Sequence, residues 1–204
     1  MRLIIEHLSK RYEKKQVLKQ IDFTFEEGKI YGLLGRNGAG KTTFFNCLNR
    51  DIAADEGQFF LEDAAGRKVL SPEDIGYVLS TPVVPEFLTG REFVKFFLDI
   101  NQNQMESPQP VDVYLQRIGI AEEDRDKLLK DYSQGMKNKM QMLINLMLRP
   151  RVFLLDEPLV SLDVVVAEEM KQLLRSFKDG RVTIFSTHIM DLALDLCDEI
   201  VLLS

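Results

Sequence analysis

The sequence predicts an α/β domain built around an open parallel β-sheet. Three short, uninterrupted apolar runs, at residues 30–34, 152–155 and 182–185, have the length and composition of strands that are buried on both faces. Segments with helical apolar spacing stand between these runs. Each run also ends in polar residues, at the edge where an open parallel sheet binds its ligands.

The composition is that of one globular domain. The 204 residues, 45% of them apolar and 28% charged, suffice for an α/β domain with a full core. We expect no nucleic-acid partner, because a formal net charge of −6 opposes binding to a polyanion. No apolar run approaches the roughly 18 residues that span a bilayer, and the charged N-terminus does not fit a signal peptide. We therefore expect the chain to stay in the cytoplasm.

The N-terminal part is predicted to be antiparallel. Residues 3–12 and 17–25 alternate apolar and polar side chains around a basic turn, which is the pattern of two paired strands. Residues 58–61 and 67–70 indicate a hairpin around a Gly-containing turn. Residues 75–78 indicate one further short apolar strand.

A glycine-rich loop follows the first apolar strand. Its glycines let consecutive backbone N–H groups turn inward around a phosphate, and a helix that begins near Lys41 adds the positive end of its dipole. Lys41 is placed to reach the β- and γ-oxygens of a nucleoside triphosphate, and the Thr42 hydroxyl to bind Mg²⁺. The predicted nucleotide-binding residues of this loop are Gly35, Asn37, Gly38, Ala39, Gly40, Lys41, Thr42 and Thr43.

The composition changes after the strand at residues 75–78. Residues 82–148 are predicted to form an inserted α-helical subdomain, while residues 1–81 and 149–204 form the core with its antiparallel β part. Together these segments make a single domain over residues 1–204.

Helices are predicted within the insert. Apolar residues at helical spacing predict helices over residues 91–100 and 111–118, and the charged residues 122–130 predict more helix. The phenylalanine stripe of residues 91–100 is expected in the core rather than on a binding surface. Ser133 fits the N-cap of a further long amphipathic helix.

Together, the glycine-rich loop, the strand at 152–156 followed by Glu157, the turn at 132–136 and His188 resemble the nucleotide-binding subunit of ABC transporters. The resemblance covers nearly all 204 residues, with the motifs in the family's order. It implies the fold of an ABC-type P-loop NTPase: an ATPase domain with an N-terminal antiparallel β part and an inserted α-helical subdomain. ATP and Mg²⁺ are the cofactors that it implies.

The resemblance also assigns roles at the nucleotide. Tyr12 matches the aromatic residue that stacks on adenine, with Val17 beneath the ring. Asp156 matches the Walker B aspartate that holds Mg²⁺, and Glu157 the carboxylate that polarises the attacking water. His188 resembles the switch histidine that contacts the γ-phosphate.

Hydrolysis of a γ-phosphate requires the same set of groups on chemical grounds. It needs a metal to neutralise charge, a group that orients water, and donors to the equatorial oxygens. Asp156 with Thr42 fills the first role and Glu157 the second. Lys41 and His188 fill the third.

One copy of the chain looks incomplete by resemblance. Ser133, Gln134 and Gly135 stand in the position of the family's signature turn, which completes the ATP site of a second subunit. Asp163, with Ser161, resembles the D-loop that contacts that subunit. We expect an ATP-sandwiched, head-to-tail dimer, with a homodimer favoured over a heterodimer. The other expected partner is a transmembrane permease subunit on another chain, which holds this chain at the inner face of the cell membrane.

Two departures from the family pattern leave alternatives open. Ser80 stands where a glutamine normally binds Mg²⁺, so we expect slowed hydrolysis or altered coupling rather than an inactive enzyme. The turn sequence at residues 132–136, YSQGM, resembles exporter-type ATPases with separate membrane subunits. The alternatives are a soluble ABC-type ATPase outside transport, or a weakly active partner in a heterodimer. The transported substrate is not indicated.

Overall fold

The computed structural model describes residues 1–105, 107–160 and 162–203. The chain divides into two compact units. The first comprises residues 1–77, 150–158 and 174–204, and the second comprises residues 78–149 and 159–173. The phosphate loop and both acidic candidates, Asp156 and Glu157, belong to the first unit.

The first unit contains the predicted antiparallel sheet, with strand order β2-β1-β4-β5. Strand β1 pairs with β2 and with β4 in antiparallel register, and β4 pairs with β5 through a turn at residues 63–66. The N-terminal strand pair predicted from alternation is confirmed, and so is the hairpin predicted from its Gly-containing turn. The strands are β1 (Arg2–Tyr12), β2 (Lys15–Glu26), β4 (Glu56–Asp63) and β5 (Gly66–Val69).

A second sheet has the order β6-β7-β8-β3-β9. The pairs β3–β8, β7–β8 and β3–β9 are parallel. All residues of β3, β7 and β8 are buried, which explains why these strands appear in the sequence as continuous apolar runs. Its strands are β3 (Ile30–Leu34), β6 (Ile75–Val78), β7 (Val152–Asp156), β8 (Val182–Thr187) and β9 (Glu199–Leu202).

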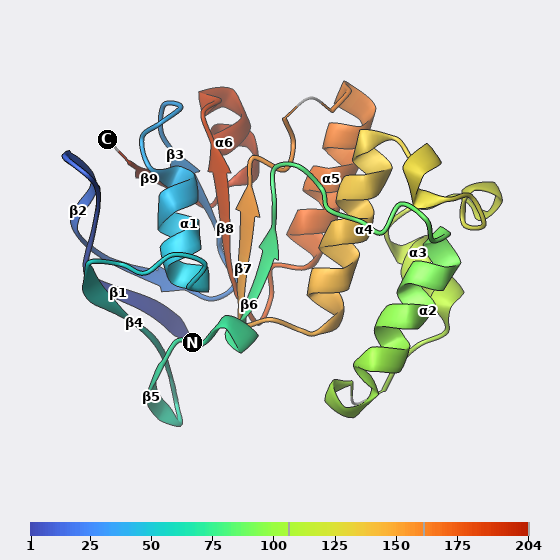
Figure 1. Ribbon diagram of the computed structural model, residues 1–204, viewed down its shortest axis with the longest axis horizontal. Helices are drawn as coiled ribbons and strands as arrows, with labels where there is room; N and C mark the ends of the chain where they lie inside the picture. Colours follow the sequence, from blue (N-terminus) through green and yellow to red (C-terminus); the bar gives the residue numbers. More distant parts are fainter. Residues whose placement is uncertain (106, 161, 204) are drawn as a thin grey trace. The chain divides into compact units, whose positions relative to one another are not determined.

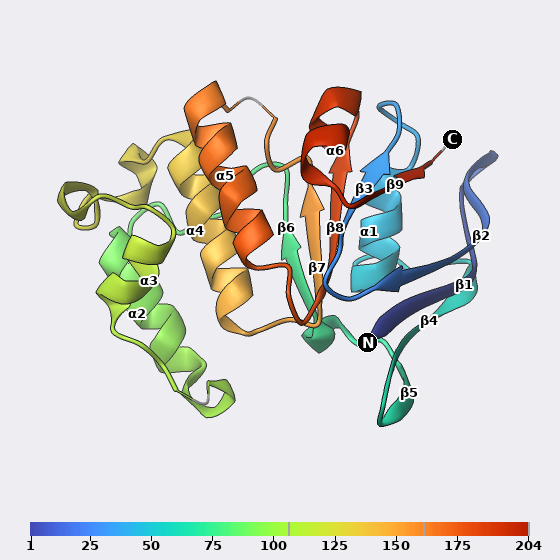
Figure 2. The ribbon, with the colours of Figure 1, turned by 180° about the vertical axis from the view of Figure 1, so that it is seen from behind.

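Two helices of the first unit cover the parallel sheet. Helix α1 (Lys41–Asn49) packs against β7 and β2, and α6 (Met190–Leu196) packs against β3 and β8. Views from the two sides show them on opposite faces of the sheet (Figures 1 and 2). Phe44 and Phe45 of α1 share one buried core with Phe25, Leu154 and Ile184. This core ties both sheets to α1 and fixes the helix that begins at the phosphate loop.

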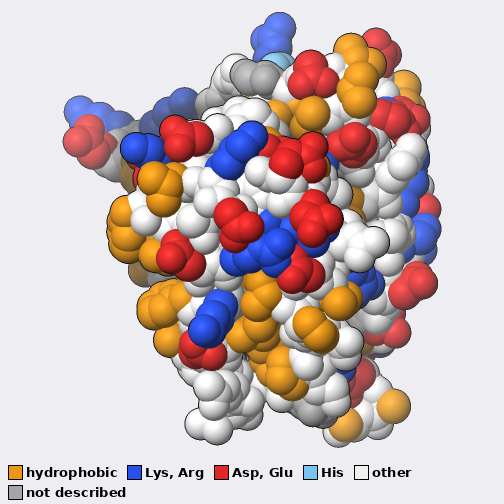
Figure 3. All heavy atoms as spheres, turned by 90° about the vertical axis from the view of Figure 1, so that its right-hand side faces the viewer, with side chains coloured by type: hydrophobic (Ala, Val, Ile, Leu, Met, Phe, Trp, Pro, Cys, Tyr) orange, Lys and Arg blue, Asp and Glu red, His pale blue; other side chains and the backbone are white. Residues whose placement is uncertain are grey.

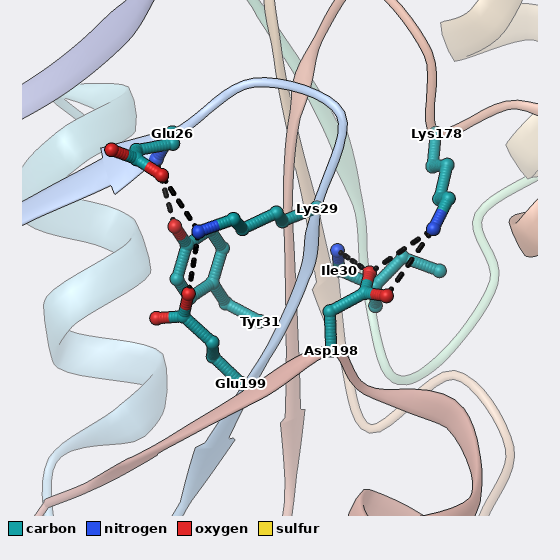
Figure 4. A network of polar contacts seen from close by, with 7 residues as sticks. All are labelled: Glu26, Lys29, Ile30, Tyr31, Lys178, Asp198 and Glu199. Carbon is teal, nitrogen blue, oxygen red and sulfur yellow. Dashed lines mark hydrogen bonds and ion pairs between the residues drawn. The ribbon is translucent and has the colours of Figure 1, made fainter.

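A polar network joins β2, β3 and β9 at the amino end of the parallel sheet (Figure 4). The Lys29 ammonium donates to Glu26 and Glu199, each at 2.6 Å. The Asp198 carboxylate accepts a hydrogen bond from the Ile30 N–H at 2.8 Å and forms an ion pair with Lys178 at 3.2 Å. Burial raises the pKa of Asp198, but these two donors outweigh it and hold the pKa below its ordinary value.

The second unit is helical. Helices α2, α3 and α4 enclose a core that includes Val94, Leu115, Tyr132, Met140 and Leu143. Ser133 caps α4 as predicted, since its hydroxyl accepts the Met136 N–H. The helices are α2 (Gly90–Ile100), α3 (Val111–Arg117), α4 (Gln134–Met147) and α5 (Val164–Ser176), of which α5 continues into the first unit.

The helix predicted over residues 122–130 is wrong. This segment holds two 3-10 turns, Glu122–Asp124 and Leu129–Asp131. The N–H groups of residues 129 and 130 donate to the carbonyls of Leu88 and Glu86, and this non-local pairing replaces helical bonds. Charge pattern alone does not reveal such pairing.

The phenylalanine stripe is only partly in the core. Phe93 and Phe97 pack against the helical core, whereas Phe96 is 55% exposed. Val83 and Phe87, which precede α2, are also exposed. Figure 3, which views the right-hand side of Figure 1, shows several groups of hydrophobic side chains next to a field of mixed charge.

Candidate functional site

The phosphate loop has the backbone geometry that its glycines predict. Gly38 and Gly40 have φ values of 82° and 103°, in the left-handed region that favours glycine. A Cβ on Gly40 would lie 2.9 Å from a methyl of Val17, so this position also lacks room for a side chain. Helix α1 begins directly afterwards at Lys41, which directs its free N–H groups to the loop.

The Lys41 side chain is buried, with 5% exposed. Its ammonium donates to the carbonyls of Gly35 and Arg36, at 2.8 and 3.3 Å, and lies 3.2 Å from Glu157 Oε1. The loop therefore holds a desolvated cation at its centre, where a phosphate oxygen can replace a carbonyl as partner.

Asp156 ends β7 and is 4% exposed. Both of its carboxylate oxygens accept hydroxyl protons: Oδ2 from Thr42 at 2.7 Å and Oδ1 from Ser186 at 2.6 Å. Thr42 and Asp156, both predicted to bind Mg²⁺, are thus hydrogen-bonded to each other, and their metal role stays a prediction. Ser186 is fully buried, and no motif in the sequence indicates a role for it.

Glu157 follows with a φ of 47°, a conformation that residues with a Cβ adopt only under local constraint. Its backbone N–H donates to Ser186 Oγ at 2.9 Å. Its carboxylate lies 3.2 Å from Nδ1 of His188, the residue that follows β8. Two strand ends and the phosphate loop therefore converge on one carboxylate.

A pocket of about 370 Å³ lies beside these groups in the first unit. Glu157 lines the pocket but His188 does not. Lys15 also lines it, although no motif in the sequence indicated this residue. Lys15 begins β2 directly opposite Tyr12, and that cross-strand register is the signal that could have found it. Its lining residues are Tyr12, Lys15, Val17, Asn37, Gly38, Gly40, Lys41, Thr42, Thr43 and Glu157.

Tyr12 stands at the rim of this pocket with 45% of its surface exposed. Lys10 lies over the Tyr12 ring, 5.5 Å from its centroid. The hydrogen bond to Asp55 is the main reason that the pKa of Lys10 is raised, so this cation is retained beside the ring. An exposed aromatic ring at the rim of a pocket suits a stacked heterocyclic base.

The signature-turn residues lie in the second unit. Ser133 and Gln134 are exposed, and Gly135 is buried against α5. A Cβ on Gly135 would come within 2.5 Å of Val166, so only glycine fits this contact. Asp163 caps α5, because its carboxylate accepts the N–H groups of Val165 and Val166.

Ser80 is exposed and also belongs to the second unit. Its predicted metal role therefore stays a prediction, as do the roles of Ser133, Gln134, Gly135 and Asp163 at a partner's nucleotide. Ser161 lies outside the described residues. Among the described residues, no cluster of three His, Cys, Asp or Glu side chains forms a metal site.

Comparison with known proteins bears on these motifs. The chain matches the family model described as "ABC transporter" over residues 18–160. It is 31% identical to the uncharacterized ABC transporter ATP-binding protein YdbJ of Bacillus subtilis, over 98% of this chain and 66% of YdbJ. It is 32% identical to CysA of Chlorella vulgaris, named as a sulfate/thiosulfate import ATP-binding protein, over 100% of this chain and 87% of CysA.

The fold is also found among solved structures. The ATP-binding cassette MJ0796, solved as a post-hydrolysis dimer with ADP and Pi, superposes with a TM-score of 0.82 at 19% identity. The match covers 99% of this chain and 94% of MJ0796. This likeness confirms the predicted α/β architecture with its parallel sheet, antiparallel β part and helical segments.

Proposed function

The chain belongs to the ABC transporter family of ATP-binding domains, and from that premise we propose that it binds and hydrolyses MgATP to drive a membrane-spanning partner on another chain. One observation carries the proposal. Within the first unit, Lys41, Glu157 and His188 meet within 3.2 Å contacts beside the Thr42–Asp156 pair. These are the groups that γ-phosphate hydrolysis requires.

The donor set fits Mg²⁺. Thr42 Oγ1 and Asp156 Oδ2 are 2.7 Å apart, and both are hard oxygen ligands of the kind that Mg²⁺ combines with substrate phosphates. Asp156 is the buried anion that such a cation would neutralise. When bound, the metal supplies charge neutralisation at the β- and γ-oxygens.

The remaining steps belong to the chain's own residues. The loop N–H groups and the start of α1 bind the phosphates, and Lys41 exchanges its carbonyl partners for phosphate oxygens. Departure of Lys41 frees Glu157 Oε1 to accept the proton of the attacking water. His188 keeps Glu157 oriented and donates toward the γ-phosphate. Tyr12 stacks on the adenine, with Val17 beneath the ring and Lys15 also in the pocket lining.

The dimer is part of the same proposal. Ser133 and Gln134 are exposed at the start of α4, where a hydroxyl and the first N–H groups of the helix form a donor set that suits the γ-phosphate of a second copy; buried Gly135 is proposed to complete this turn. The dimeric state of MJ0796 supports this arrangement. Asp163 is proposed to contact the same partner. A homodimer is favoured, because the chain has both halves of one site.

The membrane partner is proposed to dock on the second unit, which we propose corresponds to an inserted subdomain at residues 82–148. Exposed Val83, Phe87 and Phe96 give it an apolar surface for this. Among the described residues, no helix is long and apolar enough to cross a membrane. We infer that the chain lies in the cytoplasm, held at the inner face of the membrane by this partner, and that the coupling is of the exporter type. We also infer that Ser80 contacts the metal through a water molecule.

The test is ATP turnover of the purified chain and of Glu157→Gln, with size-exclusion profiles with and without MgATP. Loss of the proton acceptor should lower turnover by about 10²- to 10⁴-fold. The variant should also accumulate as an ATP-dependent dimer, because it binds ATP without hydrolysing it. Glu73→Gln, an exposed carboxylate in a turn, is the matched control and should behave as wild type.

The outcomes separate the parts of the proposal. Wild type could bind MgATP without hydrolysing it, while the Glu157→Gln variant also fails to dimerise with ATP. The homodimer proposal would then be wrong, and the chain would work with a different ATPase subunit. If Glu157→Gln keeps wild-type turnover, the assignment of Glu157 as the water-activating carboxylate is wrong.

A further inference from the structure

Ser186 forms hydrogen bonds to both acidic residues of the site. Its Oγ donates to Asp156 Oδ1 at 2.6 Å and accepts the Glu157 N–H at 2.9 Å. A hydroxyl has one proton and two lone pairs, so these two bonds fix its rotation. The side chain is fully buried in β8, where solvent does not compete for either partner.

The first bond determines how Asp156 is held. Its other oxygen accepts from Thr42, so each carboxylate oxygen has one hydroxyl donor. Without Ser186, Oδ1 would lose that donor at a residue that is 4% exposed. The carboxylate would then turn to find another partner, and the Thr42–Asp156 pair that suits Mg²⁺ would lose its geometry.

The second bond determines how Glu157 is held. The residue has a φ of 47°, which needs local constraint, and its N–H is anchored on Ser186. This backbone conformation places the carboxylate 3.2 Å from both Lys41 Nζ and His188 Nδ1. Loss of this hydrogen bond would let the backbone of Glu157 relax and move its carboxylate away from Lys41 and His188.

We propose that Ser186 is a positioning residue that aligns the metal-binding carboxylate of Asp156 with the water-activating carboxylate of Glu157. The inference depends on the proposed function, since it assigns Ser186 to that site. Strand pairing supports it, because Asp156 and Ser186 lie opposite each other at the carboxyl ends of β7 and β8. The hydroxyl therefore bridges two strands at the point where both enter the site.

The test is Ser186→Ala, measured for turnover, for the Mg²⁺ concentration that gives half-maximal turnover, and for ATP affinity in Mg²⁺ and in EDTA. Hydrogen bonds that orient metal ligands are commonly worth 10- to 100-fold, so kcat should fall by about that factor. The Mg²⁺ requirement should rise about tenfold. ATP affinity in EDTA should stay within about twofold of wild type, because the phosphate loop is untouched.

Two further variants separate positioning from folding. Thr183→Val removes another buried hydroxyl at the opposite end of β8 and should leave kcat and the Mg²⁺ requirement unchanged. Ser186→Thr keeps the hydroxyl and should recover most of the turnover that alanine loses. Midpoints of thermal unfolding without nucleotide show that each variant is folded.

Three results would overturn the inference. Ser186→Ala could match wild type in kcat and in its Mg²⁺ requirement. Thr183→Val could lose as much activity as Ser186→Ala. A folded Ser186→Thr could be as inactive as alanine. If wild type itself neither binds nor hydrolyses MgATP, the proposed function fails instead, which distinguishes the two failures.

Discussion

The two ends of the parallel sheet carry polar clusters that differ in burial. At the carboxyl ends, the side chain of Lys41 is 5% exposed and Asp156 is 4% exposed. At the amino ends, the side chains of Lys29 and Glu199 are 36% and 45% exposed. Both clusters pair lysine with carboxylate, but only the first removes its charges from water.

The difference in burial distinguishes a cluster that suits ligand binding from one that holds strands together. Buried charges are costly unless bonds hold them, so a site that keeps several of them, with Glu157 at a positive φ, is organised for a ligand. The exposed network of Lys29 joins β2, β3 and β9 by ordinary surface ion pairs (Figure 4). The buried cluster is therefore the site, and the exposed one fastens strands together.

Matched lysine variants give the sharpest contrast between the two ends. Lys41→Met should lower ATP turnover by about 10²- to 10³-fold, because it removes a preorganised donor to the phosphates. Lys29→Met makes the same chemical change at the exposed end and should leave turnover within about twofold. Steady-state phosphate release measures both. Equal effects of the two substitutions would break the distinction drawn from burial.

A smaller effect is expected at the exposed rim of the site. Tyr12→Ala should weaken ATP binding by about tenfold, since base stacking on an aromatic ring is worth about 1 to 3 kcal/mol. Tyr12→Phe keeps the ring and should bind nearly as wild type. Isothermal titration with ATP and with inorganic triphosphate measures this: triphosphate affinity should not change. A loss for both ligands would show that Tyr12 supports the loop rather than the base.

The sequence predicted the parts of the molecule whose signals are local. Strand β3 was predicted with its observed bounds, and the phosphate loop with its glycines, because apolar runs and φ requirements are written in consecutive residues. Lys41, Asp156, Glu157 and His188, which the resemblance singled out, lie close together in one unit, while their roles in hydrolysis remain predictions.

Features that depend on distant partners were missed. Ser186 acts on residues about 30 positions earlier in the chain, and only the pairing of β7 with β8 brings them together. Residues 122–130 look helical in isolation, but their backbone donates to residues 86–88. In both cases the deciding bond is between segments, and periodicity within one segment does not contain it.

The smallest effect concerns stability at the exposed end and has a defined pH window. Lys29 holds the pKa of Glu26 below its ordinary 4.5, and Glu199 and Glu26 raise the pKa of Lys29 above its ordinary 10.5. The charged form of Glu26 therefore stabilises the fold fully above pH 4.5, and this stabilisation is lost as the pH falls through the lowered pKa. The charged form of Lys29 stabilises the fold fully below pH 10.5, and this stabilisation is lost as the pH rises through the raised pKa. Lys29→Met should therefore lower the thermal midpoint by no more than about 3 °C at pH 7. That difference should shrink at pH 3 and in high salt, because the pair is exposed. A larger decrease in the thermal midpoint at pH 7 that high salt does not reduce would contradict this, because it would show that the Lys29 network is shielded from solvent like the buried site.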